Sequence, residues 1–225
     1  MLMCLLFIAV DLGRPDRFWH IIPFIGRLNF PQSILAWVVI VLNGYLLLNM
    51  HIPGYLLYKL YRGEQPTRRY YMPFVIISIF WAVSIHTVTA FLYSGLGGRP
   101  FWNTSLMAPR FLISAFAAGP ALLIIIFYLI NRFHPYFRVK ESVSKLLITI
   151  ASVTMPINLF LLGSEVFKEF YTNSSHVASA QYLFLGLHGH STLVPYIWTA
   201  IAFNIISTII FVTPVLRSKT SWLLG

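Results

Sequence analysis

Five long runs of apolar residues constrain the fold of this chain more than any other feature of its sequence. A helix needs about 20 mostly apolar residues to cross a hydrocarbon core about 30 Å thick. Runs of this length occupy residues 33–61, 71–94, 109–132, 143–171 and 192–216. Polar turns containing glycine and proline separate them, as at residues 62–66 and 95–100. The sequence therefore predicts an all-α protein, a polytopic transmembrane helix bundle with about five full spans.

The composition favours the same class. Hydrophobic residues make up 58% of the 225 residues, charged residues only 10%, and the mean hydropathy is +0.75. A soluble protein could not bury so much apolar surface. Residues 1–10 are apolar but too few to span, so we interpret them as one partial N-terminal helix whose start is missing. We expect residues 1–225 to form a single integral membrane domain, a fragment of a larger bundle.

The net charge of +10 is explained by membrane topology. In a soluble protein such a charge would suggest nucleic-acid binding, but basic loops of membrane proteins are retained on the cytoplasmic face. We therefore expect no nucleic-acid partner. The side predicted to be cytoplasmic holds ten basic residues: Lys59, Arg62, Arg68, Arg69, Arg132, Arg138, Lys140, Lys145, Arg217 and Lys219. The side predicted to face outward holds six: Arg14, Arg17, Arg27, Arg99, Arg110 and Lys168.

The single cysteine, Cys4, limits the cofactors that the chain can hold. It excludes internal disulfides, iron–sulfur ligation by this chain and c-type haem attachment. A b-type haem needs two histidines at one depth, and the candidates His51 and His86 are expected to lie at different depths. His188 and His190 flank Gly189 without a nearby cysteine or carboxylate, which favours a polar turn over a metal site. We expect no haem, no iron–sulfur cluster and no metal site in this chain.

His86 is the first candidate for chemistry, because an ionisable group at membrane depth is a default site hypothesis. It lies in the outer half of the second span, among Ser84, Thr87 and Thr89, whose hydroxyls could fix its tautomer. One interpretation is a packing histidine bonded to a backbone carbonyl. The other is a proton acceptor for a hydroquinone, since imidazole titrates near neutral pH.

A short segment from Arg99 to Arg110 is too short and too polar to span. It either lies in the interface with Trp102 at headgroup level, or it roofs a pocket for a quinone head. In the second interpretation Arg110 steadies a semiquinone or docks an acidic partner.

Glu165 and Glu169 are one helical turn apart on the same face of the fourth span. Two ionised carboxylates near hydrocarbon repel each other, so one of them is expected to hold a proton and could relay protons. The structural alternative is that Glu165 pairs with an arginine while Glu169 simply reaches water.

Five strings along the chain resemble the NrfD/PsrC family of quinol-interacting membrane subunits, with the DsrP/HybB-like branch as the nearest match. The strings are Asp11-Leu12-Gly13-Arg14-Pro15 with Arg17-Phe18-Trp19, Leu42-Asn43-Gly44-Tyr45, Ser84-Ile85-His86-Thr87-Val88-Thr89-Ala90-Phe91, Arg99-Pro100-Phe101-Trp102, and Ala108-Pro109-Arg110-Phe111-Leu112-Ile113-Ser114-Ala115-Phe116 with Gly119-Pro120-Ala121. Together they cover nearly the whole chain. Members usually carry further helices on both sides of this region, so the chain looks truncated at both ends, and Val38 stands where a carboxylate is expected.

The resemblance implies a quinone-linked anchor subunit in a prokaryotic inner membrane. Such a subunit binds a quinone (menaquinone or ubiquinone) near the outer face and exchanges electrons with a ferredoxin-like iron–sulfur subunit there. Further cytochrome, hydrogenase or sulfur-metabolism subunits complete the complex. By resemblance, His86 and Glu165 are the catalytic residues, and Glu165 and Glu169 form the proton pathway. The residues expected to bind the quinone are His86, Trp102, Arg110, Asp11, Arg14 and Asn43.

Two alternatives remain. In a secondary transporter or ion-translocating protein, Glu165 and Glu169 would be pathway groups rather than redox helpers, and inverted repeats with broken helices would support this. Prolines interrupt spans at Pro53, Pro120 and Pro156, but no repeat is evident. The other alternative is a purely structural anchor.

Overall fold

The computed structural model describes residues 6, 10, 14–22, 25–98, 100–134, 139–172 and 177–216. These residues contain helices and one isolated β-bridge, and no strand. Five helices are long and apolar enough to cross a membrane. The predicted all-α fold with five spans is confirmed. Most of the predicted partial helix over residues 1–10 lies outside the described residues.

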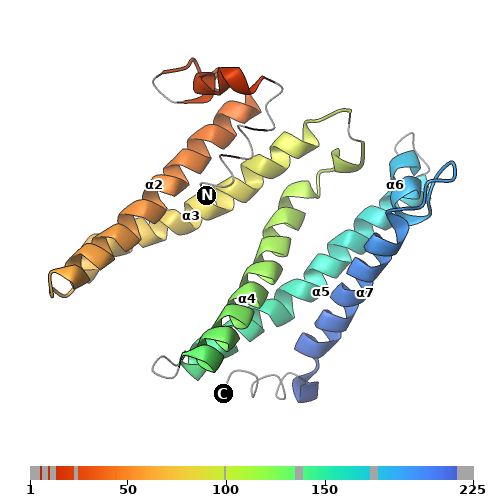
Figure 1. The fold of residues 1–225 in the computed structure, drawn as a ribbon. Helices are drawn as coiled ribbons and strands as arrows, with labels where there is room; N and C mark the ends of the chain where they lie inside the picture. The colour runs from red at the N-terminus through yellow and green to blue at the C-terminus, as the bar shows by residue number, and fades with distance from the viewer. Residues whose placement is uncertain are drawn as a thin grey trace. The chain divides into compact units, whose positions relative to one another are not determined.

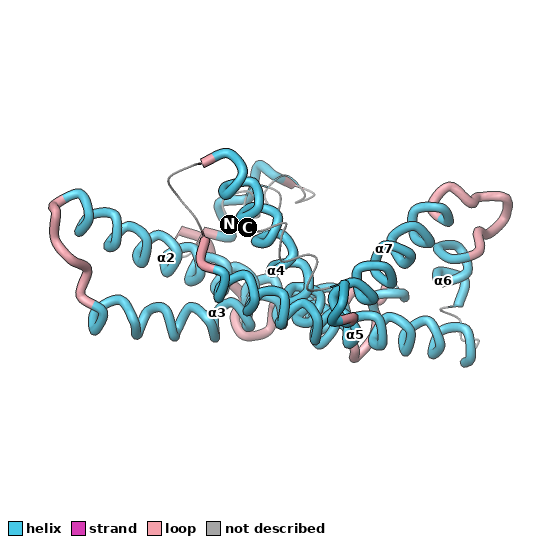
Figure 2. Tube along the Cα trace, turned by 90° about the horizontal axis from the view of Figure 1, so that it is seen from below, coloured by secondary structure: helices cyan, strands magenta, loops and turns pink. Residues whose placement is uncertain are grey.

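The chain forms two compact units, Met1–Gly95 and Leu96–Gly225. The first contains the 3-10 helix η1 (Pro15–Ile21) and the long helices α2 (Ile34–Tyr61) and α3 (Arg68–Ser94), which run side by side as an antiparallel hairpin (Figures 1 and 2). The turn between them follows Gly63, whose φ of +68° suits glycine at a helix end. That the two units form one domain stays a prediction.

A close approach between α2 and α3 organises the first unit. The indole Nε1 of Trp81 donates a hydrogen bond to the carbonyl of Val41 at 2.7 Å. A Cβ atom at Gly44 would lie 2.5 Å from the Trp81 ring, so only glycine leaves room for this indole. Small residues allow helices to pack closely in membranes, and Gly44 does so at this contact.

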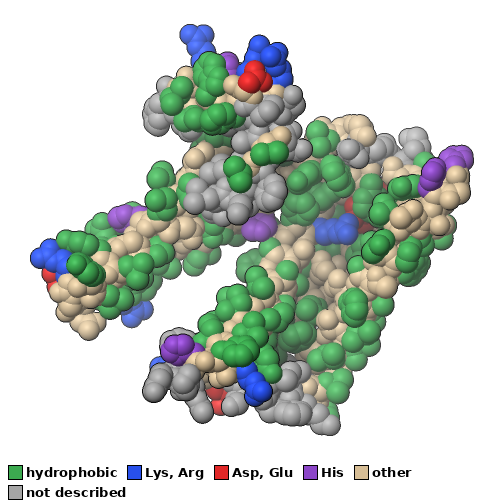
Figure 3. Space-filling model, viewed as in Figure 1, with side chains coloured by type: hydrophobic (Ala, Val, Ile, Leu, Met, Phe, Trp, Pro, Cys, Tyr) green, Lys and Arg blue, Asp and Glu red, His purple; other side chains and the backbone are tan. Residues whose placement is uncertain are grey.

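The second unit contains the 3-10 helix η2 (Pro100–Trp102), the long helices α4 (Met107–Phe133), α5 (Glu141–Thr172) and α7 (Val194–Val212), and the short helix α6 (Val177–Phe184). Helices α4 and α7 both pack against α5 (Figure 1). The Thr154 hydroxyl on α5 donates to the carbonyl of Phe116 on α4 at 3.1 Å, which fixes their register. Hydrophobic side chains cover the long helices (Figure 3), as a lipid-facing surface requires.

Helix α6 is not predicted by the sequence, because it lies between the apolar runs of residues 143–171 and 192–216. Its eight residues bury Ala180 and Phe184, and the Phe184 ring lies edge-on to Phe170 of α5 and Trp198 of α7, at 6.2 and 6.3 Å between ring centroids. Packing against two other helices therefore stabilises a segment too short to be helical by itself.

The predicted polar turn at residues 188–190 is confirmed. Leu187 and His190 exchange two backbone hydrogen bonds, and His188 and Gly189 between them have φ values of 50° and 81°. Two successive positive φ angles are typical of a tight two-residue hairpin turn.

Replacing Gly44 by Leu should lower the midpoint of thermal unfolding, because the new side chain collides with the Trp81 ring. Overpacking of this kind costs about 1–3 kcal/mol. The matched control is Gly54→Ala on the same helix, where an added Cβ meets nothing within 4 Å. Alanine should be neutral or stabilising there. Circular dichroism melts of the purified protein would show whether the two glycines differ in this way; equal melts would contradict the packing argument.

Candidate functional site

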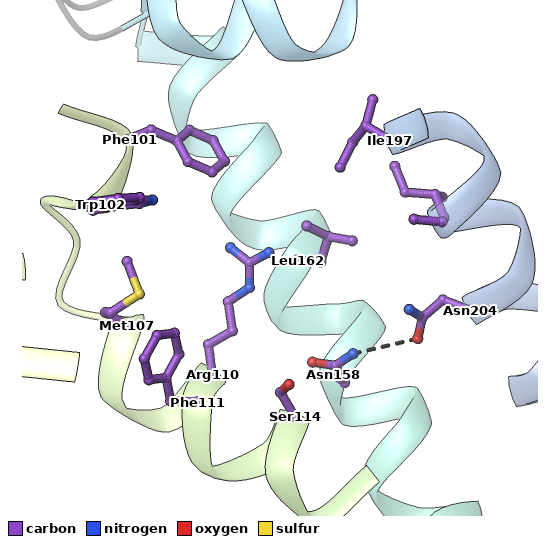
Figure 4. Close-up of a pocket in the computed structure, with 12 residues that line it drawn as sticks. Phe101, Trp102, Met107, Arg110, Phe111, Ser114, Asn158, Leu162, Ile197 and Asn204 are labelled. Atoms are coloured by element: carbon purple, nitrogen blue, oxygen red, sulfur yellow. Dashed lines mark hydrogen bonds between the residues drawn. The ribbon is translucent and has the colours of Figure 1, made fainter. Parts of the chain in front are cut away.

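A cavity of about 390 Å³ lies within the second unit, between η2, α4, α5 and α7 (Figure 4). Each long helix contributes a stripe of residues spaced three or four apart, which is one face of a helix. The lining residues are Phe101, Trp102, Met107, Arg110, Phe111, Ser114, Asn158, Leu162, Ile197, Ala200, Ile201 and Asn204.

The walls of the cavity are aromatic and aliphatic, and its polar groups lie at two places. The Arg110 side chain extends into the space beneath Phe101 and Trp102, whereas Ser114, Asn158 and Asn204 lie at the other end (Figure 4). Thr104 fixes the turn that follows Trp102. Its side chain is buried, and its hydroxyl accepts a hydrogen bond from the backbone N–H of Leu106 at 3.3 Å.

A buried ion pair borders the cavity. Arg110 Nη1 donates to Glu165 Oε2, and the side chains are 25% and 1% exposed respectively. An arginine and a carboxylate in apolar surroundings stabilise each other, because either charge alone would be costly to bury. Glu165 therefore forms an ion pair with an arginine, as the structural alternative for this residue predicted. Nη1 of Arg110 is therefore bound within the chain, and the role of Arg110 toward a semiquinone or an acidic partner stays a prediction.

Glu169 differs from the expectation that it simply reaches water. It is buried, and its Oε1 lies 3.3 Å from Nζ of Lys168, which is half exposed. Among the described residues, Glu165 Oε1 and Glu169 Oε2 are buried without a hydrogen-bond partner. Buried carboxylate oxygens normally have partners. The two atoms belong to carboxylates one helical turn apart on α5.

His86 lies on α3 in the first unit, half-buried. Its Nδ1 is 2.9 Å from the carbonyl oxygen of Ala82. A carbonyl only accepts, so Nδ1 carries the hydrogen in this contact and Nε2 is left as the basic nitrogen. The hydroxyls of Ser84 and Thr87 donate to carbonyls of their own helix.

Asn43 also lies in the first unit, where its Nδ2 donates to the Val39 carbonyl at 2.8 Å. Arg14 precedes η1 and forms an exposed pair with Asp16 at 3.4 Å. Asp11 lies outside the described residues. The structure therefore brings Trp102, Arg110, Glu165 and Glu169 together in one unit, while His86, Asn43 and Arg14 belong to the other.

His51 and His86 are displaced along the hairpin, as expected. His51 Nε2 lies 3.3 Å from the Tyr70 hydroxyl, and its ring packs against Phe74. Since Tyr70 precedes His86 by 16 residues, the two imidazoles are about 24 Å apart along α3 at about 1.5 Å per residue. This pair cannot ligate one haem.

Sequence reasoning missed three polar residues of the cavity, namely Ser114, Asn158 and Asn204. The candidate site residues within the spans were chosen mainly for their ionisable side chains, and these three residues are uncharged. Asparagine within an apolar span is itself a signal, because its amide must turn toward other helices or a cavity.

The whole chain, residues 1–225, matches the family model described as "Polysulphide reductase, NrfD". The chain belongs to the NrfD family. The predicted family is thus confirmed, and with its five membrane-spanning helices this NrfD member is a multi-pass membrane protein. The narrower assignment to the DsrP/HybB-like branch stays a prediction.

Two curated relatives resemble this NrfD member over most of its length. The Hdr-like menaquinol oxidoreductase integral membrane subunit of Archaeoglobus fulgidus is 26% identical over 97% of this chain and 51% of its own. A selenate reductase subunit of Mesobacillus selenatarsenatis is 25% identical over 76% of this chain and 46% of its own. The chain spans about half the length of these relatives. No solved structure matches it.

Replacing Arg110 by Leu should destabilise the protein, because the Glu165 carboxylate would stay buried without its partner. Breaking a buried pair costs about 3 kcal/mol or more. The double variant Arg110→Leu/Glu165→Leu should recover most of the loss in thermal unfolding midpoint. Arg14→Leu, which breaks an exposed pair, is the control and should change little. If the single and double variants melted together, the pair would not be the stabilising element.

Proposed function

We propose that this chain is the quinol-interacting membrane subunit of an oxidoreductase complex in a prokaryotic inner membrane. In this proposal it exchanges electrons between a membrane quinone, menaquinone or ubiquinone, and an adjacent iron–sulfur subunit on the outer face. Membership of the NrfD family supports the proposal, as does the likeness to subunits named for menaquinol oxidation and selenate reduction.

The observation that carries the proposal is the cavity of the second unit. Its volume of about 390 Å³ lies within the range of about 300–1,000 Å³ usual for small-molecule sites. Phe101, Trp102 and Phe111 supply flat apolar walls, and Arg110 supplies N–H donors at one end. A quinone head is a flat ring with oxygen acceptors at its edge, and these residues suit such a ligand.

The residues beside the cavity provide a path for protons. A quinol supplies two electrons and two protons when it is oxidised. Glu165 borders the cavity through Arg110, and Glu169 lies one turn further along α5, next to the half-exposed Lys168. Each of the two carboxylates has one buried oxygen without a hydrogen-bond partner among the described residues. A proton accepted at Glu165 can therefore pass to Glu169 and on to water at the outer end of α5.

His86 is proposed as a second proton acceptor, through Nε2, because the Ala82 carbonyl holds the hydrogen on Nδ1. Electrons must leave to a partner, since one cysteine cannot ligate an iron–sulfur cluster. A ferredoxin-like subunit is the proposed acceptor. Cytochrome, hydrogenase or sulfur-metabolism subunits are proposed to complete the complex.

Replacing Glu169 by Gln should slow quinol turnover about tenfold while leaving the KM for quinol within about twofold, because the amide cannot relay a proton. The measurement is steady-state quinol oxidation in membranes that contain the whole complex. Glu141→Gln is the control, since Glu141 lies exposed at the other end of α5 and pairs, within the described part of the chain, with Lys145 at 2.8 Å. Wild-type turnover in the Glu169 variant would remove this carboxylate from the route.

Replacing His86 by Ala should reduce quinol oxidation about a hundredfold, the lower end of the usual contribution of a positioned acid or base. His51→Ala is the matched control, because His51 bonds to Tyr70 at the far end of the same hairpin. Unchanged turnover in the His86 variant would assign this imidazole to packing alone.

A further inference from the structure

We propose that Asn158 and Asn204, together with Ser114, form a second polar end of the cavity, and that the cavity holds a para-quinone head by both of its oxygens. The inference rests on the proposed function and extends it to the class of head group and to residues that position it.

The two asparagines are joined across the cavity. Asn158 Nδ2 on α5 donates to Asn204 Oδ1 on α7 at 3.5 Å (Figure 4). This bond is at the long limit for hydrogen bonding, so it contributes little to holding the helices together. Each amide keeps further donor and acceptor capacity. Polar groups are costly inside apolar helices, and two amides facing one cavity indicate a polar ligand there.

Ser114 lies within about 3 Å of the level of Asn158 along the helix axes. The hydrogen bond from Thr154 to the Phe116 carbonyl places the antiparallel helices α4 and α5 in register at this level. Ser114 is half a turn from Phe116 on α4, and Asn158 is one turn from Thr154 on α5, in the same direction along the unit. Among the described residues, no hydrogen bond engages the Ser114 hydroxyl. It can therefore bind a ligand oxygen held by the amides.

The two polar ends of the cavity lie at different levels along α5. Arg110 is held at the level of Glu165 by their ion pair, and Asn158 precedes Glu165 on the same face of α5 by seven residues. Seven residues correspond to about 10.5 Å of helix. A para-quinone carries its two oxygens at opposite edges of the ring, so it can accept a hydrogen bond at each polar end of the cavity.

The two ends differ in chemistry. Arginine only donates, whereas a carboxamide pair offers both a donor and an acceptor. The asparagine end can therefore hold the ligand oxygen equally well as a carbonyl or as a hydroxyl. At the arginine end, the ion-pair partner Glu165 has one oxygen, Oε1, without a hydrogen-bond partner among the described residues, and this carboxylate is the base we assign there. We infer that proton exchange occurs at the oxygen beside Arg110, and that the asparagines hold the other oxygen in place.

The test compares two probes on the full-length protein in lipid nanodiscs, by equilibrium dialysis against protein-free nanodiscs. The first probe, 2-methyl-1,4-naphthoquinone, has oxygens at both ends of the ring. The second probe, 1-tetralone, has a single carbonyl oxygen. This oxygen should bind Arg110, because a charged donor forms a stronger hydrogen bond than an amide does. Asn158→Leu should weaken binding of the first probe about fivefold to tenfold, the effect of one hydrogen bond. Binding of the second should change less than twofold.

Asn49→Leu is the matched control, because Asn49 is an exposed asparagine of α2 that bonds only to the Tyr45 carbonyl of its own helix. It should alter neither probe. If Asn158→Leu weakened the binding of both probes equally, the amide would only maintain the fold. If it weakened the binding of neither probe, the amide would not touch the ligand. Either result overturns the inference. If the wild-type protein bound neither probe, the proposed function itself would fail.

Discussion

The ion pair between Arg110 and Glu165 is the interaction on which the second unit depends. It neutralises two charges that apolar helices could not hold separately. The same bond joins α4 to α5 and fixes the guanidinium at the edge of the cavity. Stability and site geometry therefore come from one contact, and the site can offer a strong donor without exposing an uncompensated charge to lipid.

The other polar groups of the spans divide into two kinds. Most hydroxyls and amides donate to carbonyls of their own or a neighbouring helix, as Thr154 and Asn43 do. Those around the cavity are less fully bonded: the Asn158–Asn204 contact is long, and Glu165 and Glu169 each leave one buried oxygen unpartnered. Unsatisfied polar groups cost free energy in an apolar environment. Their concentration in one unit is the reason that we regard this unit as holding the candidate site.

The fold could be predicted well and the site only in part. The five spans were located to within a few residues of their observed ends, because length and hydropathy alone decide them. The pairing of Glu165 with an arginine was one of two open interpretations, and the burial of Glu169 was not expected. Helix α6 was missed, since its stability comes from Phe184 packing between α5 and α7 rather than from its own eight residues.

The sequence by itself determined that this chain is a multi-pass helical membrane protein and, through its motifs, that it belongs with the NrfD proteins. Apolar length and local strings are properties of contiguous residues, so they can be read without a fold. Only the tertiary structure decided that Arg110, Asn158 and Asn204, from three different helices, line one cavity. Their meeting depends on the rotation and register of each helix, which side-chain packing between helices sets and no single segment encodes.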